Sequence, residues 1–117
     1  NNCLEKLNDK FSDSMRVYLW KKDDIFYIWE KNKKELTFKN DTIPLTKKET
    51  VLLELFIDKF KHNLHLNYDE IFQTVWYDKD KEYSETTIKT LLNRLRSKLP
   101  KNAINNVYGL GYTINLK

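Results

Sequence analysis

Residues 84–99 read SETTIKTLLNRLRSKL and are followed directly by Pro100. Serine is a preferred residue at a helix N-cap, and proline cannot continue a helix, so the sequence predicts a helix from Ser84 to Leu99. With 100° of rotation per residue, the large apolar side chains fall in one narrow arc that should face a core. These residues are Ile88, Leu92, Leu95 and Leu99, with Leu91 at the edge of the arc.

The opposite side of this predicted helix carries small polar and basic side chains. Small polar residues let a helix approach base edges in the major groove, and an arginine can form a bidentate bond with guanine. No acidic residue follows Glu85 in the helix, whereas ordinary solvated helices usually carry Glu–Lys pairs. The pattern favours a DNA-binding helix over a simple surface helix. Its candidate contacts are Thr86, Thr87, Thr90, Asn93, Arg94, Arg96, Ser97 and Lys98.

The net charge of +4 is concentrated at the end of the chain. Residues 84–117 hold six basic residues and one acidic residue, while residues 1–83 hold 15 basic and 16 acidic residues. Nearly all the excess charge therefore lies in the last third. This asymmetry is typical of a protein that binds a polyanion, although a lysine-rich composition with solvated charges explains it equally well.

Two further amphipathic helices are predicted before residue 84. Thr46 and Glu49 form a capping-box pattern, followed by a helical stripe of Val51, Leu52, Leu55, Phe56 and Phe60. Asn67 and Glu70 repeat the capping pattern, followed by Ile71, Phe72, Val75 and Trp76. The charged stretch 77–83 predicts a loop between the second and third helices.

Extended segments flank the three helices. Aromatic and β-branched residues cluster at 17–20, 25–29, 36–38 and 42–45, separated by turn-like residues at 21–24, at 31–33 and at the pair Asn40-Asp41. They predict a small antiparallel sheet of about four strands. Residues 104–108 and 112–116 enclose Gly109 and Gly111 and predict a terminal hairpin. The order of sheet, three helices and hairpin describes an α+β winged helix-turn-helix fold.

The remaining features argue against catalysis. The single cysteine, Cys3, excludes an internal disulfide and suits a reducing cytoplasm. His62 and His65 lack a suitably spaced third metal ligand, and Asp69 and Glu70 stand where helix capping explains them. The sequence contains no nucleophile motif, no Gly-rich phosphate loop and no apolar run of membrane-spanning length. We therefore expect a cytoplasmic protein without enzymatic activity, cofactor, metal site or membrane contact.

Taken in order, the motifs between Ile43 and Leu116 resemble the OmpR/PhoB family of winged-helix response-regulator effector domains. The resemblance rests on Leu45-Thr46 with Glu49 and Leu52-Leu53, on Glu70-Ile71 with Val75-Trp76, on Arg94-Leu95-Arg96-Ser97-Lys98-Leu99, and on Val107-Tyr108-Gly109-Leu110-Gly111-Tyr112.

The resemblance implies a winged-helix DNA-binding domain in residues 16–117, with a four-stranded N-terminal sheet. It also implies a transcription factor of a two-component system that binds tandem half-sites on double-stranded DNA, as a homodimer formed by the full-length protein. Residues 1–15 are expected to be a linker or the end of a preceding receiver domain's last helix, and phosphorylation chemistry is expected to lie outside this sequence.

Residue roles follow from the resemblance position by position. Thr90 and Arg94 would face bases, and Arg96 would bind a phosphate. Trp76 would support the contact with the DNA backbone, and Tyr112 would be the phosphate-contacting tyrosine of the wing. Lys101 and Tyr108 complete the wing and backbone candidates, and loop 77–83 would be a contact for RNA polymerase.

Three positions depart from the family pattern. Tyr108 stands where an arginine directed at the minor groove is common, Leu91 where histidine is often found, and Asn93 where a second basic residue is frequent. These differences predict weaker or differently tuned DNA binding. They also leave open a winged helix that binds protein, and a wing in which Tyr108 and Tyr112 merely pack across strands.

Overall fold

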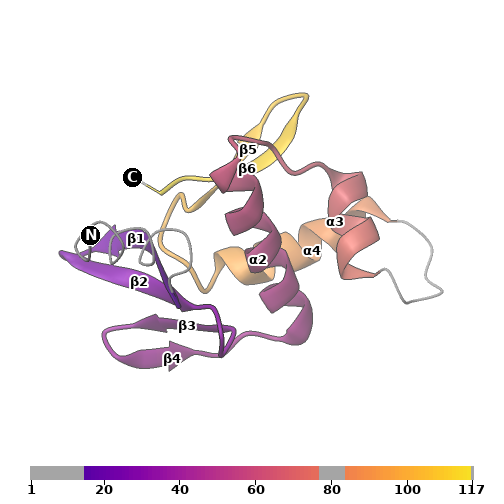
Figure 1. Cartoon of the computed structure of the whole chain (residues 1–117). Helices are drawn as coiled ribbons and strands as arrows, with labels where there is room; N and C mark the ends of the chain where they lie inside the picture. Colours follow the sequence, from indigo (N-terminus) through magenta and orange to yellow (C-terminus); the bar gives the residue numbers. More distant parts are fainter. Residues whose placement is uncertain (1–14, 77–83, 117) are drawn as a thin grey trace, which may run out of the picture. The chain divides into compact units, whose positions relative to one another are not determined.

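Figure 1 shows the computed structural model of the chain, which describes residues 15–76 and 84–116. Residues 1–14, most of the segment expected to be a linker or the end of a receiver-domain helix, and loop 77–83 lie outside the described residues. The chain forms two compact units, one ending at Pro44 and one running from Leu45 to Leu116. Each unit is considered by itself.

The first unit is the predicted four-stranded antiparallel sheet, in the order β1-β2-β3-β4. Its strands are β1 (Arg16–Lys22), β2 (Ile25–Glu30), β3 (Glu35–Phe38) and β4 (Asp41–Ile43). Two residues of β1, Leu19 and Trp20, oppose the single residue Tyr27 of β2, which makes a β-bulge. The bulge allows two consecutive side chains of β1 to be buried.

Tight two-residue turns connect β1 to β2 and β3 to β4. Asp23 and Asp24 have φ values of 54° and 64°, and Lys39 and Asn40 have φ values of 54° and 69°. Positive φ at both central residues is the requirement of the type I′ turn that suits the twist of a hairpin. The predicted turn pair Asn40-Asp41 is therefore wrong by one position, because Asp41 already pairs with Phe38 as the first residue of β4.

The second unit contains three helices and a hairpin. They are α2 (Lys47–Lys61), α3 (Tyr68–Val75), α4 (Glu85–Arg96), β5 (Ile104–Val107) and β6 (Gly111–Ile114). Both predicted capping boxes are confirmed, Thr46 with Glu49 at α2 and Asn67 with Glu70 at α3, and Ser84 caps α4 through the amide of Thr87. Together with the sheet, these elements confirm the winged helix-turn-helix fold.

The buried stripe of α2 differs from the predicted one. Leu52 and Phe56 are buried as expected, but the other buried apolar residues are Leu53 and Ile57, while Phe60 is 40% exposed. The helix has apolar residues on two adjacent sides, and only contacts with α3, α4 and β6 decide which side is covered.

Helix α4 ends at Arg96, three residues before the predicted end at Leu99. The amide of Lys98 donates to Leu95 O and that of Leu99 donates to Arg96 O, so the chain tightens into a turn before Pro100. The predicted core arc of the helix is confirmed, since Ile88, Leu92, Leu95 and Leu99 are buried together with Leu91.

Strand β6 of the hairpin is attached to the loop before α3. Leu66 and Tyr112 exchange two backbone hydrogen bonds of 2.8 Å each, so the loop before α3 pairs with the inner strand β6. A Cβ atom on Gly111, whose φ is +127°, would lie 2.4 Å from Leu66 O. Glycine is therefore required where these two backbones meet.

We expect Gly111→Ala to lower the free energy of unfolding by more than about 2 kcal/mol, because the methyl group meets backbone in a conformation that side chains avoid. Gly109→Ala is the matched control. Gly109 also has positive φ, but its Cβ would meet nothing within 4 Å, so its cost should be about 1 kcal/mol. Urea unfolding measures both values. Equal losses would contradict a steric role for Gly111.

Candidate nucleic-acid interface

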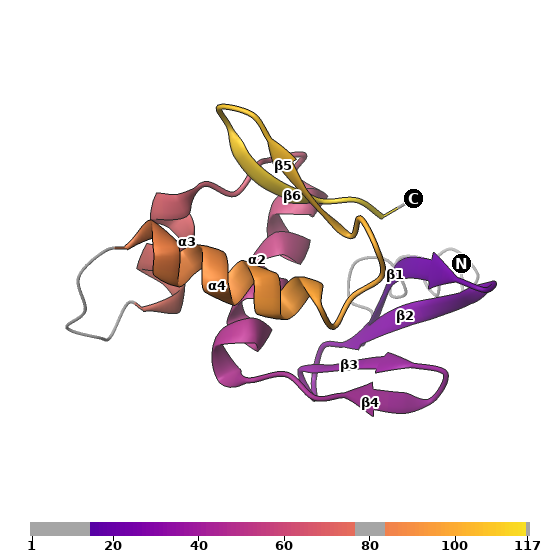
Figure 2. The ribbon, with the colours of Figure 1, turned by 180° about the vertical axis from the view of Figure 1, so that it is seen from behind.

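Helix α4 presents a continuous exposed stripe. Each of the three turns contributes two exposed residues, and the C-cap residue extends the stripe: Glu85, Thr86, Lys89, Thr90, Asn93, Arg94 and Ser97. Figure 2 shows α4 in orange, crossing in front of α2 with its N-terminal end beside α3. An α-helix with its side chains fits into the major groove of B-DNA, which is about 12 Å wide. The predicted outward side of α4 is thus open.

The side chains of this stripe keep their capacity to bind a ligand. The Thr90 hydroxyl donates to Thr86 O (2.9 Å) and the Ser97 hydroxyl donates to Arg94 O (2.7 Å), so both hydroxyl oxygens can still accept. The Arg94 guanidinium has no hydrogen-bond or ion-pair partner among the described residues. Thr87 is half-buried in the first turn of α4.

Arg96 lies at the junction of α4 and the wing and is half-buried. Its Nη2 donates to Ile104 O (3.3 Å), and its guanidinium lies 5.7 Å from the centre of the Tyr112 ring. A guanidinium has five donors, so this contact leaves others free. Arg96 therefore supports the first strand of the wing, and its predicted phosphate contact stays a prediction.

Tyr112 is buried, with its hydroxyl 2.8 Å from that of Tyr68 on α3. Burial, together with the hydrogen bond to Tyr68, raises the pKa of Tyr112, so its hydroxyl stays protonated at neutral pH. Only one hydrogen is used between the two hydroxyls. The other remains available to an acceptor outside the pair.

Trp76, at the C-cap of α3, is also buried. Its ring stacks on Phe72 with centroids 5.6 Å apart, and Lys48 Nζ lies 5.7 Å from the ring centroid. The indole Nε1–H has no hydrogen-bond partner among the described residues. Buried hydrogen-bond donors are rarely left without an acceptor, so the indole N–H of Trp76, unpaired within the described part of the chain, is an unusual feature of this region.

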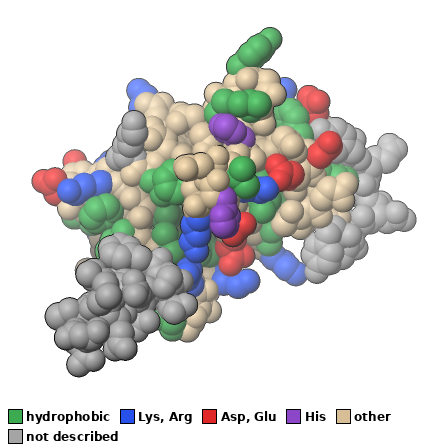
Figure 3. All heavy atoms as spheres, turned by 45° about the horizontal axis from the view of Figure 1, so that its top comes forward, with side chains coloured by type: hydrophobic (Ala, Val, Ile, Leu, Met, Phe, Trp, Pro, Cys, Tyr) green, Lys and Arg blue, Asp and Glu red, His purple; other side chains and the backbone are tan. Residues whose placement is uncertain are grey.

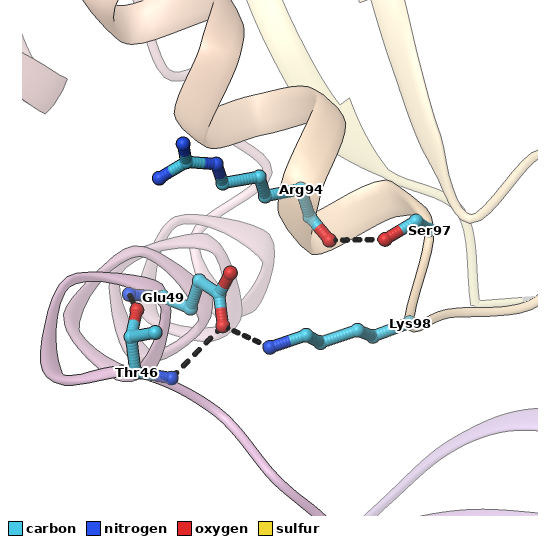
Figure 4. Close-up of polar contacts among 5 residues, drawn as sticks. All are labelled: Thr46, Glu49, Arg94, Ser97 and Lys98. Atoms are coloured by element: carbon cyan, nitrogen blue, oxygen red, sulfur yellow. Dashed lines mark hydrogen bonds and ion pairs between the residues drawn. The ribbon is translucent and has the colours of Figure 1, made fainter.

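Lys98 reaches from the turn after α4 to a buried carboxylate on α2 (Figure 4). Its Nζ lies 2.5 Å from Glu49 Oε1, which also accepts from the Thr46 amide at 2.9 Å. The Glu49 side chain is only 2% exposed. Burial alone would raise the pKa of Glu49, but the hydrogen bonds from Lys98 and Thr46 outweigh it and lower that pKa. The charge of Lys98 is thus largely balanced within the domain.

The wing ends in exposed apolar side chains. Tyr108 is 99% exposed and Leu110 is 56% exposed, on either side of Gly109. No charged residue occurs between Asn102 and Leu116, and Lys101, just before this segment, is exposed. The interpretation that Tyr108 packs across strands is wrong, because its side chain is almost fully exposed to solvent. The Tyr112 side chain is buried, as that interpretation expected.

Both histidines of the chain lie on the face shown in Figure 3, and both are exposed in the connection between α2 and α3. Basic, acidic and apolar side chains surround the two histidines on this face. Within residues 15–76 and 84–116, no group of three or more His, Cys, Asp or Glu residues could hold a metal ion. In the same residues, no helix has both the length and the apolar character of a membrane span.

Three residues of this region were missed by the sequence analysis. Tyr68 pairs with Tyr112 across 44 positions, Lys48 lies over the Trp76 ring, and Glu49 holds Lys98 across 49 positions. Glu49 was recognised as a capping residue only. No local pattern could have revealed these pairings, since the helices that bring the partners together are distant in sequence.

The fold and the exposed α4 stripe define a winged helix-turn-helix domain. A family model described as "Transcriptional regulatory protein, C terminal" matches residues 40–114. The chain belongs to this family, the C-terminal effector domains of OmpR/PhoB-type response regulators, as the sequence motifs predicted.

Individual proteins agree with this assignment. The regulatory protein VanRB of Enterococcus faecalis is 36% identical over 73 residues, which are 62% of this chain and 31% of VanRB. The chain thus spans about a third of that relative. The DNA-binding domain of CssR from Bacillus subtilis is 32% identical with a TM-score of 0.60, over 76% of this chain and 99% of that domain. The corresponding domain of CpxR from E. coli has the same fold, with a TM-score of 0.61 at 22% identity over 85% of this chain and 94% of that one.

The Glu49–Lys98 pair gives a testable stability prediction. Lys98→Met should lower the free energy of unfolding at pH 7 by about 2 kcal/mol, because it leaves a buried carboxylate without its partner. Lys101→Met, the control, removes an exposed lysine nearby and should change it by less than about 0.5 kcal/mol.

The pH dependence of this loss follows from the lowered pKa of Glu49. The stabilisation by a carboxylate with a lowered pKa is complete above its usual value of 4.5 and is lost as the pH falls through the folded-state pKa. The difference between wild type and Lys98→Met, measured by urea unfolding at a series of pH values, should therefore shrink in acid. A constant difference would mean that the pair is not responsible.

Proposed function

We propose that this chain binds double-stranded DNA in a sequence-specific manner, as the output domain of a two-component response regulator that controls transcription. Helix α4 enters the major groove, and the hairpin β5–β6 lies along the adjacent backbone or minor groove. The family assignment supports this function, as does the similarity to the CssR DNA-binding domain.

The exposed stripe of α4 is the observation that carries the proposal. Thr90, Asn93 and Arg94 are open to solvent, while the leucines of the same helix are buried. Had the protein's own chain covered these three residues, the helix could not serve as a recognition helix. Arg94 is the base-contacting residue, with Thr90 and Asn93 beside it, since an arginine without a partner among residues 15–76 and 84–116 can form two bonds with guanine.

The supporting contacts come from the helix flanks and the wing. Arg96, Lys101 and the hydroxyl pair of Tyr112 contact the phosphates, with Trp76 behind the backbone contact. Lys98 contributes least among these candidates, because its ammonium is paired with Glu49. Tyr108 replaces the arginine common in the family, and as an uncharged aromatic side chain at the wing tip it makes an apolar contact in the minor groove. Apolar side chains are used in this way by other minor-groove binders.

The properties of a longer protein belong to the same proposal. A receiver domain would precede residue 16, two copies would occupy tandem half-sites, and loop 77–83 would contact RNA polymerase. The domain acts by binding and not by catalysis, in the cytoplasm where bacterial DNA is found.

Arg94→Ala should weaken binding to a selected high-affinity duplex by about 10- to 100-fold and binding to mixed-sequence DNA much less, because a bidentate base contact carries the specificity. Arg96→Ala should weaken binding to both duplexes by similar factors, as expected of a phosphate contact. Fluorescence anisotropy with both duplexes measures this. A folded Arg94→Ala protein with full sequence preference would rule out α4 as the recognition helix.

Salt dependence separates DNA binding from the alternative of a protein-interaction module. The logarithm of the DNA-binding constant should fall linearly with the logarithm of the salt concentration, with a slope of about −0.9 for each phosphate contact. An apolar protein interface would show almost no slope. If the binding constant for mixed-sequence DNA does not change with salt concentration, the protein-binding function would be favoured.

A further inference from the structure

A hollow on the surface of the second unit joins α2 to the proposed DNA-binding side of α4. It is lined by Lys48 from the first turn of α2, by Trp76 from the end of α3, and by residues of the first half of α4, among them Thr86, Thr87, Thr90 and Arg94. Two of these residues, Thr90 and Arg94, were assigned above to base contacts. The hollow therefore lies directly beside the region where α4 would meet DNA.

Lys48 is the cation of this hollow that lies outside α4. Its side chain is exposed, and its Nζ lies over the ring of Trp76, which attracts a cation through the negative face of its π system. Within the described part of the chain, Lys48 has no acidic partner. The buried tryptophan thus holds an ammonium group at the edge of α4 while its charge remains available.

The neighbouring carboxylate does not compete for Lys48. Glu49 is next in sequence, but its side chain is buried and its Oε1 atom already accepts from Lys98 and from the Thr46 amide. An exposed glutamate at this position would repel an incoming phosphate. Because Glu49 is turned inward and neutralised, the first turn of α2 presents only positive charge to its surroundings, through Lys47 and Lys48.

The rest of the lining also favours an oxyanion. Thr86 and Thr87 belong to the first turn of α4, where the helix dipole attracts negative charge. Trp76 contributes the ring that holds the Lys48 ammonium. A cation and threonine hydroxyls in one hollow are groups that bind a phosphate.

We propose that this hollow receives one phosphate of the DNA backbone, with Lys48 as its ion-pair partner, so that α2 as well as α4 and the wing contacts DNA. The proposal rests on the DNA-binding function proposed above. Lys48 acts on affinity and not on sequence preference, because a phosphate carries no sequence information.

The test compares Lys48→Gln with Lys47→Gln in the 117-residue chain. Both lysines are exposed and occupy the first turn of α2, but only Lys48 lines the hollow and lies over Trp76. The measurement is fluorescence anisotropy with a mixed-sequence duplex over a range of salt concentrations, and with a selected duplex at one of them. Circular dichroism confirms that each variant is folded.

Lys48→Gln should weaken binding to both duplexes about five-fold at 0.15 M salt and make the log–log salt slope shallower by about 0.9. Lys47→Gln should leave the slope close to that of the wild type, and Lys48→Arg should restore it. A Lys48→Gln slope equal to that of Lys47→Gln would overturn the phosphate site while leaving DNA binding by α4 intact. A wild-type protein without a salt slope would overturn both proposals.

Discussion

Glu49 has its carboxylate in the interior of the domain, where an unpaired charge would be strongly unfavourable. It must therefore keep both the Thr46 amide, which closes the cap of α2, and the Lys98 ammonium, which arrives from the turn after α4. One side chain thus joins the start of one helix to the end of another. The buried leucines fix the rotation of α4 about its axis, and the Lys98–Glu49 contact holds the end of α4 to the start of α2. The polar stripe can then face only outward.

Local sequence rules determined most of the fold. Capping residues marked the starts of all three helices correctly, because a side chain that accepts an amide hydrogen bond acts within three residues of itself. The buried side of α4 was predictable because its apolar residues occupy one arc. The buried side of α2 was not, since apolar residues at 51 and 55 are as hydrophobic as those at 53 and 57, and only packing selects between them. The early end of α4 had no local signal before Pro100.

The candidate site likewise combines features that the sequence predicted with features that only the folded chain reveals. Exposure of Thr90, Asn93 and Arg94 follows from helical periodicity alone. The hydroxyl pair of Tyr68 and Tyr112, and the position of Lys48 over Trp76, depend on helices that meet only in the folded chain. In the wing, the hairpin itself was predictable from its two glycines. The sequence did not show that Tyr112 is buried while Tyr108 is exposed.

The two glycines give the hairpin a stem and a tip with opposite tolerance to change. At the stem, Gly111 lies against the backbone of Leu66, so no side chain fits there. At the tip, Gly109 has empty space around it and its neighbours Tyr108 and Leu110 contribute little to the core. Natural variation in the length and chemistry of the wing should accumulate at residues 108–110. The same segment can be replaced by randomised sequences, to retarget the domain to new DNA shapes, without unfolding it.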